Sequence, residues 1–183
     1  PGWISRAKRG DAGRMLERAA AYFELAKSQG WRRVAAEQQM SLVLGRARIS
    51  GVVDRLEADA DGRLRILDFK TGSSKPKREE VAKHPQLGAY QEAVERGAFG
   101  PGAVSAGAAL VQLGKAGGVR ITSAVQEQVP LAEADEPGWA RDLIEQAATT
   151  MAGATYRAIQ GTWCRTCPVR TSCPVHAEGA MLA

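Results

Sequence analysis

Two carboxylates and a lysine stand on neighbouring apolar runs of this sequence, within the segment ISGVVDRLEADADGRLRILDFKTG that runs from Ile49 to Gly72. Side chains alternate along a strand, so Asp68 and Lys70 are predicted on one face and Phe69 on the other. An Asp-Gly pair between the two runs is typical of a hairpin turn. Pairing through that turn would bring Asp54 of the first run close to Asp68.

Such a group of side chains suits a divalent cation. Two carboxylates that lie close together repel each other and lose hydration, and a bound cation relieves both costs. Hard oxygen ligands favour Mg²⁺ or Mn²⁺, which keep waters for chemistry. A lysine beside the ion can orient or deprotonate a water, or stabilise a developing oxyanion. The spacing is equally compatible with a surface hairpin that carries solvated charges, because Asp-x-Lys is common by chance.

The elements that would position these groups follow from hydrophobic periodicity and turn residues. Their order is α-β-β-β-α-β-β-α, which predicts an α/β (α+β) domain with a central mixed sheet flanked by helices. The expected elements are a helix over residues 12–28, strands over 33–44, 47–57 and 63–70, a helix over about 79–96, strands in GAALVQLGK and VRITSAVQEQV, and a last helix in EPGWARDLIEQAATTMAGATYRAIQ.

Length and composition bound the organisation of the chain. Its 183 residues, 44% of them hydrophobic, suit one globular core, which we expect over residues 1–160 with a cysteine-bearing tail over 161–183. The net charge of +5 favours phosphate-bearing partners, though only weakly. No apolar run approaches the roughly 20 residues of a membrane span, and no signal peptide opens the chain, so we expect no membrane partner and a cytoplasmic protein.

Three short motifs follow one another along the chain: Gly-x-x-Asp, then Asp-Phe-Lys-Thr, then Gln-x-x-x-Tyr. Together they resemble the nuclease domain of the RecB family, which belongs to the PD-(D/E)xK nucleases, over about residues 33–175. The resemblance implies a restriction-endonuclease-like core, and the element order of that family agrees with the order that periodicity predicts. The motif residues are Gly51 and Asp54, Asp68 to Thr71, and Gln86 and Tyr90.

The resemblance also implies roles for the residues of the hairpin. Asp54 and Asp68 would be metal ligands, with the backbone carbonyl of Phe69 as a third ligand. Lys70 would serve the attacking water. The cation implied is Mg²⁺ or Mn²⁺.

Residues outside the hairpin complete the expected site. Gln86 and Tyr90 lie at positions i and i+4 of a helix and would touch DNA or steady the site, or simply pack on the sheet. Family members usually supply an upstream histidine ligand, whereas the histidines of this chain, His84 and His176, both follow the hairpin. The chain begins without an initiator Met, and we expect either that this histidine lies in a preceding segment or that the site is weakened. Glu37 is a further candidate carboxylate ligand, or else a surface glutamate.

All three cysteines of the chain, Cys164, Cys167 and Cys173, lie in the last 23 residues. Their close spacing in a reducing compartment favours metal binding over a disulfide. The C-x2-C-x5-C pattern resembles the iron–sulfur segment of AddB-type nucleases, which implies a [4Fe–4S] cluster with a fourth cysteine outside this chain. The alternatives are a zinc site completed by His176 and, if the fourth cysteine is missing, three reduced thiols without a metal.

The resemblance implies a deoxyribonuclease of the exonuclease type that acts on single-stranded DNA or duplex ends. It is closest to the C-terminal nuclease modules of actinobacterial RecB-like and AdnAB-type helicase–nucleases. This implies helicase domains in the same polypeptide or complex, a partner helicase–nuclease subunit, and a role in double-strand-break end resection and recombinational repair. The alternatives are a catalytically impaired DNA-binding or scaffold module with the same fold, and a stand-alone CRISPR-associated exonuclease.

Overall fold

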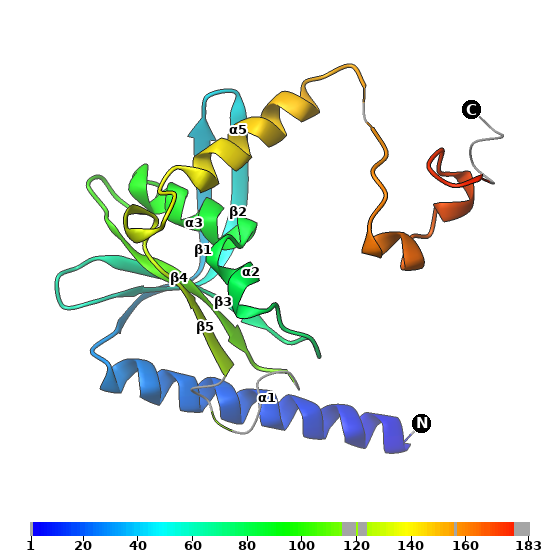
Figure 1. The fold of residues 1–183 in the computed structure, drawn as a ribbon. Coiled ribbons are helices and arrows are strands. Elements are labelled where there is room, and N and C mark those ends of the chain that lie inside the picture. Colours follow the sequence, from blue (N-terminus) through cyan, green and yellow to red (C-terminus); the bar gives the residue numbers. More distant parts are fainter. Residues whose placement is uncertain (1, 115–119, 121–123, 156, 178–183) are drawn as a thin grey trace. The chain divides into compact units, whose positions relative to one another are not determined.

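A mixed five-stranded sheet with helices on both faces forms the body of the protein in this computed structural model (Figure 1). The structure describes residues 2–114, 120, 124–155 and 157–177. Two compact units divide the chain, Pro1–Gln146 and Ala147–Ala183, so the expected tail from residue 161 lies inside the second unit. The described elements are α1 (Gly2–Ser28), β1 (Arg32–Leu44), β2 (Ala47–Ala58), β3 (Leu64–Lys70), α2 (Arg78–Ala82), α3 (Pro85–Glu95), β4 (Ser105–Gln112), β5 (Val125–Gln128), α5 (Trp139–Met151), and the 3-10 turns η2 (Leu131–Glu133), η3 (Thr162–Thr166) and η4 (Arg170–Ser172).

The strands lie in the sheet in chain order, β1-β2-β3-β4-β5. Three neighbouring pairs are antiparallel, and β3 and β4 are parallel. A parallel pair needs a crossover connection, and the segment with α2 and α3 supplies it. The mixed sheet and flanking helices confirm the predicted α+β class.

The turn between β2 and β3 forms as the Asp-Gly pair predicts. Gly62 has φ of 81°, a left-handed conformation that glycine adopts without steric cost. The Asp59 carboxylate braces the turn, because its Oδ1 accepts the backbone N–H groups of Asp61 at 3.0 Å and of Arg63 at 2.9 Å. The hairpin that carries both aspartates is therefore locally determined.

Apolar side chains pack on both faces of the sheet, as alternation along buried strands requires. The larger core lies on the face covered by α3, and the smaller lies on the face covered by α1. Prominent members of the first are Met40, Leu42, Val53, Leu56, Ile66, Leu87, Val94 and Leu110. Those of the second are Tyr22, Ala26, Leu67, Ala109, Val111 and Leu113.

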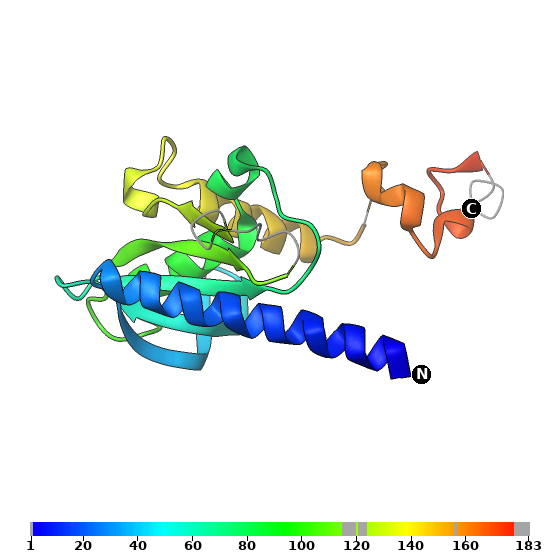
Figure 2. The same cartoon turned by 90° about the horizontal axis from the view of Figure 1, so that it is seen from below.

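Helix α1 runs along one face of the sheet (Figure 2) and is held there by a buried polar network. The Tyr22 hydroxyl donates to Glu57 Oε2 at 2.9 Å, and Arg65 Nη2 lies 2.9 Å from the same oxygen. Arg55 Nε donates to Glu57 Oε1 at 2.7 Å. Both oxygens of the fully buried Glu57 carboxylate are thus paired, as a buried charge requires.

Several predicted elements differ from the structure in their bounds. The first helix begins at Gly2 rather than at residue 12. The helix expected over 79–96 is two helices, because Pro85 disfavours helical backbone in the preceding residue and opens α3 instead. The last helix ends at Met151 rather than near residue 160. The strand expected in VRITSAVQEQV includes residues outside the described part, and β5 occupies Val125–Gln128.

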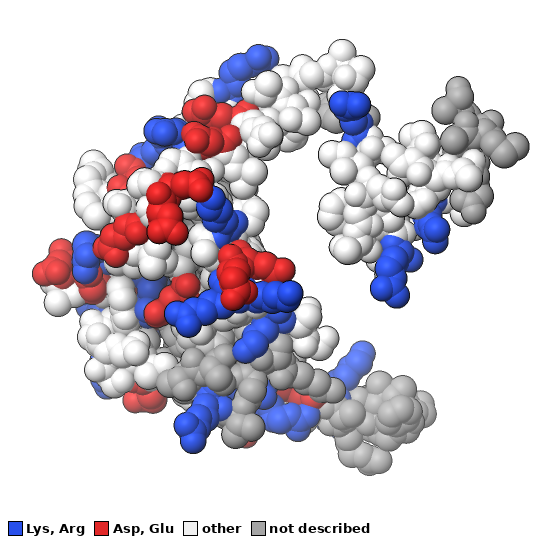
Figure 3. All heavy atoms as spheres, viewed as in Figure 1, with Lys and Arg blue, Asp and Glu red and all other residues white. Residues whose placement is uncertain are grey.

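Charges of both signs occur on the first unit in the view of Figure 3. In the second unit, residues 147–177 contain Arg157, Arg165 and Arg170 and no aspartate or glutamate. Within the described residues, no helix is long and apolar enough to cross a membrane.

Candidate active site

The β2–β3 hairpin opens at the point where the two aspartates stand. The ladder between the strands ends with Arg55 opposite Leu67, and Asp54 and Asp68 come next across the opening. Asp54 Oδ2 accepts a hydrogen bond from the Phe69 backbone N–H at 2.7 Å. The carboxylate thereby accepts a hydrogen bond from the Phe69 N–H, which has no backbone partner on β2 because the ladder has already ended. The Asp54 side chain is held in the gap between the strands.

A continuous set of hydrogen bonds joins β3 to α3 on the other side of Asp68. Lys70 Nζ lies 2.7 Å from Asp68 Oδ2. Gln86 bridges this ion pair, because its Nε2 donates to Asp68 Oδ1 at 2.7 Å and its Oε1 accepts from Lys70 Nζ at 2.9 Å. Gln86 Nε2 also donates to the Tyr90 hydroxyl at 2.9 Å. The structure therefore brings together Asp68 and Lys70 of β3 with Gln86 and Tyr90 of α3.

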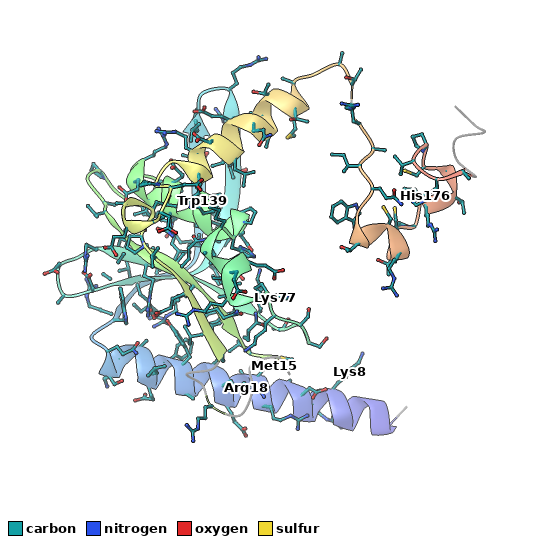
Figure 4. The ribbon with its side chains drawn as sticks, in the orientation of Figure 1. Lys8, Met15, Arg18, Lys77, Trp139 and His176 are labelled. Atoms are coloured by element: carbon teal, nitrogen blue, oxygen red, sulfur yellow. The ribbon has the colours of Figure 1, made fainter. Side chains whose placement is uncertain are left out.

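Helix α3 is fixed over the sheet by close packing and by buried amides. A Cβ atom on Gly88 would lie 2.4 Å from the ring of Trp139, which stands at the start of α5 (Figure 4), so the two helices meet at a glycine. Gln91 Nε2 donates to Gln128 Oε1 at 2.9 Å, and Ser105 Oγ donates to Gln91 Oε1 at 2.9 Å. These contacts set where Gln86 meets the hairpin.

Burial and the neighbouring charges shift the pKa of Tyr90. Burial is the main cause that raises the pKa of the Tyr90 hydroxyl. The hydrogen bond from Gln86 opposes this effect, and the Asp68 and Asp54 carboxylates add to it. The hydroxyl is therefore protonated at neutral pH, and it donates to the Val52 carbonyl at 3.4 Å.

His84 belongs to the same neighbourhood, which sequence reasoning missed. Burial lowers the pKa of its imidazole, and the positive charge of Lys70 lowers it further, while Asp68 opposes both. His84 Nδ1 is buried and has no hydrogen-bond partner among the described residues. The imidazole is thus neutral at neutral pH. The signal in the sequence was its place just ahead of Pro85, two residues before Gln86.

Gln112 is a second residue that sequence reasoning did not place here. It lies opposite Lys70 in the parallel β3–β4 ladder, so the two side chains share a face of the sheet. Gln112 is 1% exposed, yet within the part of the chain that the structure describes neither amide atom has a hydrogen-bond partner. Native structures contain few such buried groups, and each calls for an explanation. Its signal was a lone amide inside the apolar run GAALVQLG.

The pairing of β3 indicates which way the Phe69 backbone faces. The Lys70 carbonyl faces β4, because it accepts the Leu113 N–H at 2.8 Å. Backbone groups alternate along a strand, so the Phe69 carbonyl faces the gap where its N–H meets Asp54. The Phe69 ring packs against Tyr22 on the α1 face, as alternation predicts.

Glu37 lies across from Asp54 in the β1–β2 ladder, between the pairs Ala36–Arg55 and Gln38–Val53. It is exposed, and its φ of 49° is the only left-handed value among described residues other than glycine. Across the described residues, no group of three or more His, Cys, Asp or Glu side chains gathers closely enough to hold a metal ion. Glu37 therefore does not complete a carboxylate triad with Asp54 and Asp68.

The donor set at the opening still fits a hard divalent cation. Asp54 and Asp68 supply oxygens from opposite sides of the gap, and the Phe69 carbonyl adds another. Mg²⁺ characteristically binds through one or two carboxylates and keeps several waters, so a set with two carboxylates suits it. Each carboxylate oxygen that accepts one hydrogen bond has a second lone pair for a further partner.

The three cysteines lie in the second unit, on or beside the 3-10 turns η3 and η4. All are free and partly buried. The Cys164 sulfur accepts the Gly161 N–H at 3.3 Å. In the described part of the same unit, the buried His176 Nε2 has no hydrogen-bond partner (Figure 4). As far as the structure describes this unit, these four side chains do not come together as a metal-binding group.

Comparison with known proteins adds one finding. The family model described as the PD-(D/E)XK nuclease superfamily matches residues 1–174. The curated proteins contain no match to the chain.

Proposed function

The chain belongs to the PD-(D/E)XK nuclease superfamily, and we propose that it is a Mg²⁺- or Mn²⁺-dependent deoxyribonuclease of the exonuclease type. One observation carries this proposal. Asp54, Asp68 and Lys70 converge where the β2–β3 hairpin opens, and Gln86 is hydrogen-bonded to both Asp68 and Lys70. A basic group beside two acidic groups at a strand opening suits phosphodiester hydrolysis.

Asp54, Asp68 and the Phe69 carbonyl would hold the cation. When bound, a divalent cation makes water a stronger nucleophile and offsets the negative charge that develops on the phosphate. The protein contributes fixed positions for these ligands. The hydrogen bond from the Phe69 N–H orients Asp54, and the Gln86 amide orients Asp68.

Lys70 would orient the attacking water. An ammonium group has three N–H donors. Two of the Lys70 donors are directed at Asp68 Oδ2, 2.7 Å away, and at Gln86 Oε1, 2.9 Å away. The third donor is left for a water or a phosphate oxygen. The Lys70 side chain is 35% exposed, so its end is accessible to a substrate. Asp68 and Gln86 restrict where the third donor points.

Gln86 and Tyr90 would act as positioning residues. Gln86 spans the Asp68–Lys70 pair and also donates to the Tyr90 hydroxyl. Tyr90 in turn donates to the Val52 carbonyl on β2 at 3.4 Å. The pair therefore ties α3 to both strands of the open hairpin. A small displacement of α3 would disturb the ligands and the lysine together.

The test is cleavage of a labelled single-stranded oligonucleotide in Mn²⁺, in Mg²⁺ and in EDTA. We expect cleavage with either metal, none in EDTA, and a loss of about 100-fold or more in Asp54→Asn, because a metal ligand is removed. The matched control is Asp61→Asn, the same change at the exposed hairpin turn, which should cleave like the wild type. Cleavage in EDTA that Asp54→Asn leaves unchanged would contradict the proposal.

One finding favours a second candidate, a catalytically impaired DNA-binding or scaffold module. Within the described residues, Asp54 and Asp68 have no third metal-ligating side chain beside them. Such a module would bind DNA but would not cleave it in any metal. The same experiment separates the two candidates when binding of the oligonucleotide is measured alongside.

The cysteine tail would hold a [4Fe–4S] cluster with a fourth cysteine from outside these residues. The support is the Cys164-x2-Cys167-x5-Cys173 spacing and the three free thiols. The cluster would order a tail with little core of its own. Protein purified without oxygen should be brown. A colourless sample with one equivalent of zinc, lost in His176→Ala, would instead support the zinc alternative.

The setting proposed for this nuclease is a RecB-like helicase–nuclease that resects double-strand breaks for recombinational repair. It rests on the likeness of the three motifs and the cysteine tail to that family. Co-purification with a helicase, in the same polypeptide or as a partner subunit, tests it. A protein that cleaves single strands fully without any helicase would instead support a stand-alone exonuclease.

A further inference from the structure

A shallow hollow of about 450 Å³ lies beside Asp54, on the face of the sheet that carries α1. It lies beyond the Asp68–Lys70–Gln86 group, which occupies the α3 face. The hollow brings together two guanidinium groups, two carboxylates and two aromatic rings. These belong to Arg33, Arg55, Glu37, Asp54, Phe23 and Phe69.

Arg55 is held in a fixed orientation at the edge of the hollow. Its Nε donates to the buried Glu57 carboxylate at 2.7 Å, and its guanidinium carbon lies 4.5 Å from the centroid of the Phe23 ring. A guanidinium carries five N–H donors in a planar fork, and the bond to Glu57 uses only Nε. Because the plane is already ordered, contact with a phosphate would cost little further side-chain entropy.

The β1 side of the hollow is irregular. The ladder with β2 shifts register between Arg33 and Ala35. Glu37 then adopts a φ of 49°, a left-handed conformation that is strained for a residue with a side chain. Such strain is concentrated at functional sites. It occurs here directly across from Asp54.

The charges around the hollow balance when no cation is present. Arg33 and Arg55 match Asp54 and Glu37, and Arg65 offsets the buried Glu57 carboxylate that Arg55 also contacts. A divalent cation held by Asp54 would leave an excess of positive charge. An anion would therefore bind in the hollow more tightly when the metal is present.

We propose that this hollow binds a nucleotide of a single-stranded nucleic acid. This nucleotide would lie next to the phosphate that is hydrolysed at Asp54 and Asp68. Arg33 and Arg55 contact the phosphates on that side, and the Arg55–Phe23 stack packs against the unstacked base. Combined arginine and aromatic contacts are typical of single-strand binding. A base within a duplex is already stacked on its neighbours, whereas the base of a single strand is free to pack on this stack, so we expect the hollow to bind single strands in preference to duplex. This inference rests on the proposed function, since it takes Asp54 as a metal ligand.

The test measures binding by fluorescence anisotropy, with and without Mn²⁺, as a function of salt. The probe is a labelled single strand of about 12 nucleotides with cleavage-resistant phosphorothioate linkages. Arg33→Ala should raise the Kd about tenfold in Mn²⁺, since a charged hydrogen bond to phosphate is lost. It should also reduce the slope of log Kd against log salt by about 0.7, the value for one phosphate contact on a single strand. The matched control is Arg32→Ala, an exposed neighbour outside the hollow.

A second variant tests the charge balance independently. Glu37→Gln removes one negative charge and should lower the Kd in the absence of metal. Equal Kd and salt slope for Arg33→Ala and Arg32→Ala would overturn the inference. These assays do not use cleavage, so they separate the two proposals. If Arg33→Ala weakens binding but the wild type shows no Mn²⁺-dependent cleavage, the binding proposal is supported and the nuclease proposal is contradicted. If the wild type cleaves in Mn²⁺ but Arg33→Ala binds like Arg32→Ala, only the binding proposal is contradicted.

Discussion

Gly114 is the residue whose substitution should most sharply link packing to activity. It follows β4 and lies directly against the end of the Asp-Phe-Lys-Thr-Gly motif. A Cβ atom at this position would lie 2.2 Å from the Gly72 carbonyl oxygen and 2.3 Å from that of Thr71. Leu113 and Gly114 both donate their backbone N–H groups to the Lys70 carbonyl, at 2.8 and 3.2 Å. The added methyl group of Gly114→Ala would push on the backbone that carries Lys70.

The size of the effect follows from these distances. Real Cβ contacts essentially never fall below 3.0 Å, so the two backbones must part by roughly 1 Å. They cannot part freely, since Arg18 Nη1 of α1 (Figure 4) donates to the Leu113 and Gly114 carbonyls at 2.7 Å each. Overpacking of this kind costs about 1–3 kcal/mol of stability. A shift of about 1 Å at a catalytic group reduces a rate by about 100-fold.

The assay pairs a urea unfolding curve with the rate of oligonucleotide cleavage in Mn²⁺. Gly72→Ala is the matched control, because a Cβ there meets nothing within 4 Å and the residue stands only a few positions from Lys70. We expect Gly72→Ala to behave like the wild type in both measurements. Gly114→Ala should fold with reduced stability and cleave about 100-fold more slowly. If the two variants behave alike, the reasoning from close backbone approach is refuted.

Three further outcomes follow from the buried polar groups. Tyr22→Phe removes the hydroxyl that donates to the buried Glu57 at 2.9 Å, and should lower the free energy of unfolding by about 1–3 kcal/mol in urea; an unchanged midpoint would contradict this. The pKa of His84 is lower in the folded protein than its ordinary value of about 6.5, which applies to the unfolded chain. As the pH falls below about 6.5, the unfolded chain therefore takes up a proton at a higher pH than the folded protein does. Its contribution to stability is therefore complete above that pH and is lost below it, so His84→Gln should show a smaller fall in urea midpoint from pH 7.5 to 5.5 than the wild type. Gln112→Leu replaces two unpaired buried atoms with a side chain of similar volume and should raise the free energy of unfolding by about 1–3 kcal/mol; a loss of stability would show that the amide has a partner such as bound water.

The hairpin and the facing of its side chains were predictable because they depend on local rules. An Asp-Gly turn sets the pairing of β2 with β3, and the period of two then places Asp68 and Lys70 together. Helical spacing likewise placed Gln86 and Tyr90 on one face. No short sequence pattern predicts that β2 and β3 separate at Asp54. The separation depends on β3, which leaves β2 after Leu67 but continues to pair with β4 as far as Lys70.

The residues that sequence reasoning missed reach the site through long-range contacts. Gln112 faces Lys70 only through the register of two strands that are far apart in sequence. His84 approaches Lys70 because Pro85 restarts the helix. Such pairings depend on the whole sheet and on the crossover, and no short pattern specifies them. The family resemblance supplied the chemical roles, which periodicity alone does not provide.

The central claim, that the open hairpin hydrolyses phosphodiester bonds with a divalent cation, is tested most directly at Asp68. The measurement is the release of nucleotides from a labelled single-stranded DNA in Mn²⁺ by the wild type and by Asp68→Ala, with circular dichroism to verify that both are folded. The account predicts release by the wild type and none above background by the variant. Equal release by both proteins would contradict it.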